Sequence, residues 1–311
     1  MVEHTSGAEK RSFDFPASAI PAEVINMEDP EYIARRLAMP VAAGQLWMAK
    51  TKGEAQYVLI TAVDGEDPRT ITVIPLSNNT AERTDGSLIV DRTPLGMPMV
   101  AWPALATSIP VRVLFKPLDE FNPQTTEALA ADHADEKLGI NRATAPDDPM
   151  ESAEQEIHEI EHSLESWHKL CADLPKLHAD RTAAEHSGDE LAAYADALKN
   201  VLHLTPGQRI AVSRGKALTD EQQSRMAAAG FPESPYNRPQ VDDDYLVEVE
   251  QPRWRAAANA LAASGVTGDP RERLAYKAQF ELAARVNGHG VEALRGALHK
   301  AAATVLADPR D

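Results

Sequence analysis

The stretch AQYVLITAVDGEDPRTITVIPLS, residues 55–77, contains two apolar runs with a polar segment between them. The runs AQYVLITAV and RTITVIPLS are rich in β-branched residues, which favour strands. Gly, Pro and Asp, which are typical of turns, occupy the segment between the runs. This stretch therefore predicts two β-strands, and it sets the fold class of the N-terminal part of the chain.

Further short runs of the same kind lie on both sides of this stretch, namely GQLWMAK, SLIVDR, MPMVAW and VRVLF. Five or six short strands in about 80 residues favour a closed sheet, because closure removes exposed strand edges. We therefore predict a small β-barrel over residues 41–121. Residues 1–40 form an N-terminal extension, in which DPEYIARRLA predicts a short helix with Asp29 near its N-cap and Pro30 in its first turn.

The chain after the predicted barrel has no convincing strand except the alternating segment DYLVEVE, residues 244–250. Its expected parts are an acidic linker at 122–149, an acidic coiled-coil-like helix at 150–187, a helix-turn-helix at 188–235 and a C-terminal helical domain at 245–311.

Composition limits the class of protein. The 311 residues carry a formal net charge of −17, which opposes a surface that is basic throughout but allows a local basic face. Cys171 is the only cysteine, so no internal disulfide is expected. No apolar run approaches the 18 residues of a membrane span, and the first residues have no apolar leader segment. We expect a cytoplasmic protein with no membrane partner and, in the absence of any phosphate loop or catalytic motif, no cofactor.

The segment His158-Glu-Ile-Glu-His162 matches the H-E-x-x-H pattern of zinc metalloproteases. The apolar residues around it have the 3,4 spacing of a heptad and are Ile157, Ile160, Leu164, Trp167, Cys171 and Leu174. That register puts both histidines on the solvent side, so we expect no zinc. The apolar stripe fits either a helical hairpin within one chain or a dimerising coiled coil, and the acidic helix 150–174 is a possible surface for a protein partner.

Residues 41–121 resemble the PemK/MazF-like SH3-type barrel of toxin–antitoxin ribonucleases. Gly44, Leu46 and Trp47 match the first strand of that family, and Pro75-Leu76-Ser77 matches its later turn. The Arg-Pro of the family is absent, because Gln56-Tyr57 stands in its place. The family's arginine stabilises phosphate charge. The resemblance implies an SH3-like barrel, with a ribonuclease centred on Ser77 as an alternative function.

Residues 188–231 resemble the XRE/HigA-like helix-turn-helix, most clearly in LHLTPGQRIAVSRGKALTDEQQSRMAAAG at 202–230. The resemblance makes Thr205 an N-cap, Pro206 the first residue of the recognition helix and Val212 a core contact, with Gly215 closing the helix and Leu218-Thr219 starting the next. Three positions depart from the family: Lys199 and His203 stand where it has Ala and Gly, and Arg209 replaces an aliphatic residue.

This second resemblance implies double-stranded DNA as the partner. Gln208 and Arg209 suit base edges, and Ser213, Arg214 and Lys216 suit phosphates. Residues 205–225 hold four bases and two acids: Arg209, Arg214, Lys216 and Arg225 against Asp220 and Glu221.

The sequence as a whole predicts an α+β multidomain protein, with a small N-terminal SH3-like β-barrel followed by an all-α region with a helix-turn-helix. We expect a DNA-binding transcriptional regulator of toxin–antitoxin or phage-related type that acts as a homodimer. The alternative from another class is a non-enzymatic interaction or inhibitor protein whose acidic helix mimics nucleic acid.

Overall fold

The chain divides into two units in the computed structural model, which describes residues 29–51, 55–146, 151–177, 188–213, 218–232, 234–235, 241–266, 268–283 and 290–308. The first, called the sheet unit here, comprises the described residues up to Leu174 together with Glu250–Arg255. The second comprises the described residues of Pro175–Val249 and those from Ala256 onward. The fold is of the α+β class.

The sheet unit is built on antiparallel strands, and the stretch 55–77 forms two neighbours in it. The strands are β1 (Gln45–Lys50), β2 (Ala55–Val63), β3 (Thr70–Ser77), β4 (Leu88–Val90), β5 (Met99–Ala101), β6 (Thr107–Pro110), β7 (Leu114–Glu120) and β8 (Ile140–Arg142). They are paired in the order β7-β1-β2-β3-β5-β4-β8, and β6 also pairs with β3.

The sheet is not closed, which corrects the expectation of a closed barrel. In the described part of the chain, the two end strands β7 and β8 do not pair with each other. The edge of β3 that does not pair with β2 is shared by two strands. Residues Thr70–Val73 pair with β6, whereas Leu76–Ser77 pair with β5. A register shift in β2 next to Ile60 adds a local bend of the kind that β-bulges produce.

The described residues of the segment 122–149, expected to be an acidic linker, belong to the sheet unit. It contains α3 (Pro123–Ala130), whose N-cap Asn122 accepts a 2.8 Å hydrogen bond from the amide of Thr125, and it contains β8. Leu129 and Ile140 are fully buried. This segment therefore extends and covers the sheet.

Two apolar clusters lie on opposite faces of the sheet, as strand alternation requires. One contains Leu59 of β2 and Leu129 of α3. The other contains Val58 of β2 and Ile71 of β3, together with Trp167 of α4 (Glu151–Lys169). The sheet is thus covered by a helix on each face.

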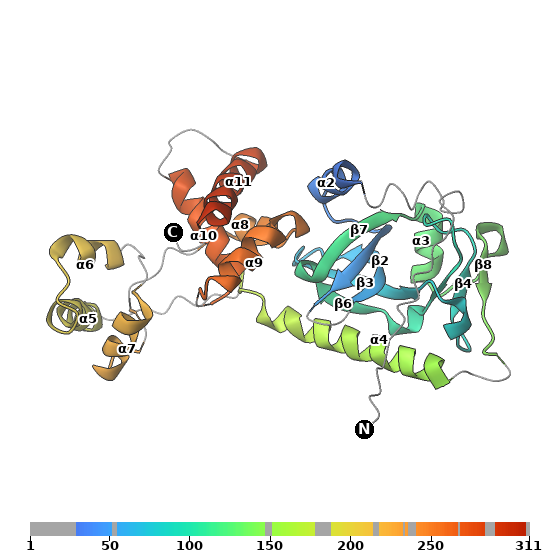
Figure 1. The fold of residues 1–311 in the computed structure, drawn as a ribbon, viewed down its shortest axis with the longest axis horizontal. Coiled ribbons are helices and arrows are strands. Elements are labelled where there is room, and N and C mark those ends of the chain that lie inside the picture. The colour runs from blue at the N-terminus through green and yellow to red at the C-terminus, as the bar shows by residue number, and fades with distance from the viewer. Residues whose placement is uncertain are drawn as a thin grey trace, which may run out of the picture. The chain divides into compact units, whose positions relative to one another are not determined.

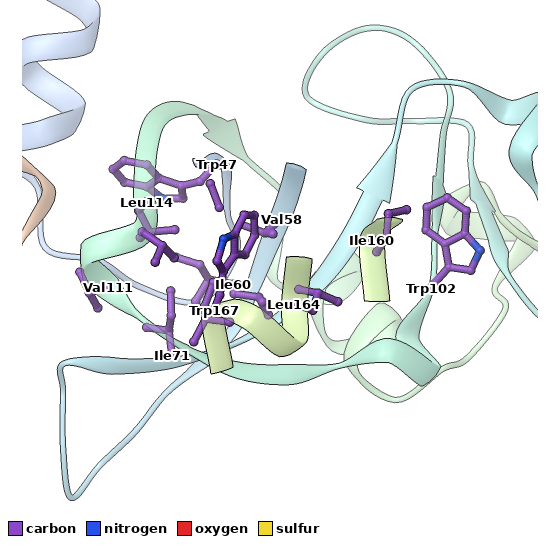
Figure 2. Close-up of a cluster of buried hydrophobic side chains, with 14 of the residues drawn as sticks. Trp47, Val58, Ile60, Ile71, Trp102, Val111, Leu114, Ile160, Leu164 and Trp167 are labelled. Atoms are coloured by element: carbon purple, nitrogen blue, oxygen red, sulfur yellow. The ribbon is translucent and has the colours of Figure 1, made fainter. Parts of the chain in front are cut away.

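The apolar stripe of α4 packs against the sheet within the same chain. Ile160, Leu164 and Trp167 are buried in the second cluster, where Figure 2 shows Trp167 next to Val58 and Ile60. The indole nitrogen of Trp167 donates a 2.9 Å hydrogen bond to Thr51 Oγ1. The stripe therefore has its partner inside the chain, and in the described residues it is not an open seam for a coiled coil.

The predicted N-terminal helix is confirmed as α2 (Pro30–Ala38), with Pro30 in its first turn. The side chain of Asp29 caps it by accepting a 3.0 Å hydrogen bond from the amide of Glu31. Arg36 fixes the helix to β7 through ion pairs with Asp119 and Glu120.

The second unit is helical throughout its regular elements. These are α5 (Gly188–Asn200), α6 (Pro206–Ser213), α7 (Asp220–Ala228), α8 (Asp243–Val249), α9 (Arg255–Ala263, whose first residue belongs to the sheet unit), α10 (Pro270–Ala283) and α11 (Val291–Ala307). The strand-like segment at 244–250 is therefore helical as far as Val249, and α10 packs against both α8 and α11. Among the described helices, none combines the length and apolar character that crossing a bilayer requires.

Candidate functional site

Figure 1 shows the helices α5, α6 and α7 grouped together. They are called the α5–α7 bundle here, and they enclose an apolar core of their own. Tyr194 and Leu198 of α5, Val212 of α6 and Met226 of α7 are buried in it. The ring of Phe231 meets that of Tyr194 edge-on, with 5.7 Å between the ring centroids. The helices predicted at these positions are confirmed as elements, and Val212 makes the predicted core contact.

Both helices after the turn are capped as the sequence predicts. Thr205 Oγ1 accepts from the amide of Gln208 at 3.4 Å, and Gln208 Oε1 accepts from the amide of Thr205 at 2.9 Å. Thr219 and Gln222 form the same reciprocal pair at the start of α7. These capping boxes satisfy amides that the helix itself leaves without partners. Gln208 thus has a structural role through its side-chain oxygen.

The turn between α5 and α6 contains a left-handed residue. His203 has φ of 54°, and it occupies the position that the resemblance assigns to glycine. Left-handed backbone favours glycine, because a Cβ atom approaches the following carbonyl oxygen. The backbone therefore adopts the conformation that suits glycine, although the residue is histidine.

Replacing His203 with glycine is expected to stabilise the α5–α7 bundle by about 0.5–1 kcal/mol, since the left-handed conformation then costs less. Hydrogen exchange of the α5–α7 amides in the full chain measures the effect. A His203→Ala variant keeps the Cβ atom and should change little. A glycine variant that exchanges faster than the parent would show that this turn is not strained.

Three of the five predicted DNA-contacting residues lie on α6 among the described residues. Gln208 and Ser213 are exposed, and Arg209 is half-buried with its Nε covered. Ser213 Oγ donates to the carbonyl of Ile210 at 2.9 Å. The remaining two predicted residues, Arg214 and Lys216, lie outside the described residues, as does Gly215.

Ile210 is a surface residue that the sequence reasoning missed. Its side chain is 52% exposed, which is unusual for isoleucine. The sequence position of Ile210 could have predicted this exposure, because a residue two positions before Val212 cannot share the buried side of Val212 on the helix. An exposed aliphatic side chain beside Gln208 and Arg209 suits contact with a thymine methyl group.

The two positions singled out by the resemblance to PemK/MazF-like proteins, Gln56 and Ser77, meet at one pocket of the sheet unit. Gln56 and Ser77 both line it, at adjacent ends of β2 and β3. Ser77 Oγ donates a 2.6 Å hydrogen bond to Glu82 Oε2, and Gln56 Nε2 donates to the carbonyl of Leu76 at 2.6 Å. No lysine or arginine lines this pocket in the described part of the chain. A phosphate would therefore meet a carboxylate and an amide at this site.

We expect the purified chain not to cleave single-stranded RNA, because among the described residues no lysine or arginine lines the pocket at Ser77 to stabilise phosphate charge. Ser77→Ala should instead cost about 1 kcal/mol of stability through the lost hydrogen bond to Glu82. Gel analysis of RNA incubated with both proteins, together with denaturant unfolding, measures the two effects. Cleavage by the parent chain that Ser77→Ala abolishes would establish the ribonuclease alternative.

The H-E-x-x-H pattern lies on the outer face of α4. Both His158 and His162 are exposed, on the side away from the buried residues Ile160 and Leu164. Over the described ranges, no three His, Cys, Asp or Glu side chains come together in a way that could hold a metal ion.

Neither the known protein families nor the curated proteins contain a match to this sequence.

Proposed function

We propose that the chain is a DNA-binding transcriptional regulator whose α5–α7 bundle binds duplex DNA with α6 in the major groove. One observation carries this proposal. Val212 is the buried side chain of α6, whereas Gln208, Ile210 and Ser213 are exposed along the same short helix. Ile210 lies on the side of α6 opposite Val212, whereas Gln208, four residues before Val212, is exposed at the N-terminal end of the helix. A short helix that is fixed to a small bundle and exposes polar and aliphatic groups at its N-terminal end and outer side has the form of a recognition helix.

The chemistry of α6 suits direct reading of bases. The side-chain nitrogen Nε2 of Gln208 remains available to donate to adenine, since the capping bonds use the side-chain oxygen Oε1. Arg209 suits guanine, and Ile210 suits the thymine methyl group. Ser213, followed by Arg214 and Lys216, suits the phosphates next to the groove.

The distribution of charge supports the same partner. The chain carries −17 overall, yet residues 205–225 carry four bases and two acids. Phosphate contacts by such a local basic segment supply the sequence-independent part of DNA affinity. We further propose a homodimer on a palindromic operator, since isolated helix-turn-helix units read half-sites spaced by one turn of DNA. The two family resemblances favour a toxin–antitoxin or phage-related role.

The substitutions Arg209→Ala and Lys216→Ala are expected to weaken DNA binding in different ways. Loss of a base contact at Arg209 should cost about 1–3 kcal/mol on the preferred operator and blur its sequence preference. Loss of a phosphate contact at Lys216 should weaken binding to all duplexes alike and reduce the salt slope by about one. Fluorescence anisotropy titrations at two salt concentrations measure both. Equal losses on operator and random duplex for Arg209→Ala would contradict its base-reading role.

Gln208→Glu provides the matched control, because glutamate at this position keeps the capping box with Thr205. It also places a negative charge near the helix N-terminus, where it is favourable. The variant should therefore fold at least as well as the parent but bind DNA more weakly, since the amide donor is gone and phosphates are repelled. DNA affinity unchanged in a stable Gln208→Glu variant would place the interface elsewhere.

The second candidate function is an acidic interaction protein, and the outer face of α4 favours it. With the apolar stripe buried on the sheet, Glu154, Glu159, Glu161 and Glu165 are exposed along one helix. Such a row of carboxylates could imitate a nucleic-acid backbone toward a basic protein. This alternative predicts binding to a basic protein partner and none to duplex DNA.

A further inference from the structure

A pocket of about 170 Å³ lies in the sheet unit at the ends of β2 and β3, where α4 contributes one wall. It is the pocket already described at Ser77. The α4 residue that lines it is Glu156, and Met48 of β1 and Tyr57 of β2 supply apolar surface. The pocket thus combines a carboxylate, polar side chains and an aromatic ring.

The hydrogen bonds around the pocket leave one buried acceptor free, the side-chain oxygen of Gln56. Gln56 is only 9% exposed, and its amide nitrogen is held by the carbonyl of Leu76. Its side-chain oxygen accepts no hydrogen bond from any described residue, so it is available to a ligand donor. The hydroxyl of Ser77 already donates to Glu82 Oε2. The other carboxylate oxygen of Glu82 accepts a hydrogen bond from Asn79 Nδ2 at 2.6 Å.

Glu156 adds a negative charge that nothing in the described chain neutralises. It is half-buried, and it forms neither a hydrogen bond nor an ion pair with a described residue. Burial raises the pKa of Glu156, and the nearby carboxylates of Glu82 and Glu159 raise the pKa further. A cation in the pocket would relieve both effects, because it would replace the lost hydration and offset the repulsion.

We propose that this pocket binds a small organic cation, whose ammonium or guanidinium group pairs with Glu156 and donates a second hydrogen bond to Gln56. The ligand's alkyl stem lies against Met48 and Tyr57, and the Tyr57 ring also attracts a cation. A metal ion fits less well, because no group of three metal-ligating side chains occurs among the described residues. This site is independent of the proposed DNA interface.

Isothermal titration calorimetry of the full chain with agmatine, a small alkyl guanidinium, tests the proposal. We expect saturable binding with one ligand per chain, weakened about tenfold or more in Glu156→Gln by loss of a charged hydrogen bond. Glu161→Gln, which removes an exposed charge from the same helix, should bind like the parent. Affinity should also fall as the pH drops through the raised pKa of Glu156, because the protonated carboxyl no longer attracts the cation.

A folded Glu156→Gln variant that binds agmatine as tightly as the parent, or a parent chain that binds none, would overturn the proposal. Thermal unfolding of each variant verifies that it is folded. Magnesium chloride is titrated in parallel, and Glu156-dependent binding of magnesium without agmatine binding would make the pocket a metal site instead. If a glycine–arginine–glycine tripeptide binds more tightly than agmatine, the pocket binds an arginine side chain of a partner protein, and the proposal of a small organic ligand is wrong.

Discussion

Trp167→Ala is expected to destabilise the sheet unit by about 3–5 kcal/mol, which is the usual cost of removing a buried tryptophan. The side chain is fully buried, it packs among the residues of β2 and β3, and its indole nitrogen bonds to Thr51. The substitution therefore creates a cavity between α4 and the sheet and also removes a hydrogen bond. Denaturant unfolding followed by circular dichroism measures the loss.

Two further variants make this result specific. Trp167→Phe keeps most of the apolar contact and should cost clearly less than the alanine variant. Lys169→Ala removes an exposed residue of the same helix, whose ion pair with Glu165 is worth little. If Trp167→Ala instead left the stability intact but changed the oligomeric state on gel filtration, the stripe would pack between chains and the present account of α4 would be wrong.

Arg112→Ala is the second substitution with a large expected effect. Glu250 is only 1% exposed, and both of its oxygens face the guanidinium of Arg112, with 2.8 Å from Nε to Oε2. Removing one partner of a buried ion pair takes away much of the compensation for the remaining charge, which costs up to about 3–5 kcal/mol. We expect a loss of that size in the stability of the sheet unit, measured by denaturant unfolding.

The double variant Arg112→Ala with Glu250→Gln separates charge from packing. The neutral side-chain amide of Gln at position 250 costs less to bury than the carboxylate of Glu250 without Arg112. The double variant should therefore recover much of the stability that Arg112→Ala loses. Equal stabilities for the single and the double variant would mean that the charge of Glu250 is neutralised by something other than Arg112.

The sequence predicted best what depends on neighbours along the chain. The caps at Asp29, Thr205 and Thr219 were predicted correctly, because a capping side chain bonds to amides two or three residues away. The strands of residues 55–77 were equally clear, since both runs are long and bounded by turn residues. Helix α4 was predicted from its heptad spacing, but that spacing does not reveal whether the apolar stripe meets a sheet or a second chain.

What the sequence could not show depends on distant pairing. The three residues of β8 pair with β4, which lies about 50 positions earlier, and so short a run has no periodicity of its own. The segment at 244–250 alternates like a strand, yet Tyr245, Leu246 and Val249 become buried at helical spacing in α8. Seven residues are too few to distinguish the two patterns.

The candidate sites show the same division. Gln56 and Ser77 were singled out through a family resemblance, and the structure places both at one pocket. The third group of that pocket, Glu156, was one of many acids on α4, and only the packing of α4 on the sheet brings it there. On α6, the polar residues were predicted, whereas the exposure of Ile210 required the fold of the bundle.

The central claim is that the α5–α7 bundle reads duplex DNA, and the most direct measurement is a binding titration of the full chain against genomic duplex fragments at two salt concentrations. If α6 reads bases, some fragment will bind about a thousandfold or more tightly than random duplex, with affinity falling as salt rises. If no fragment binds better than random duplex at moderate salt, the bundle has a structural role and the account is contradicted.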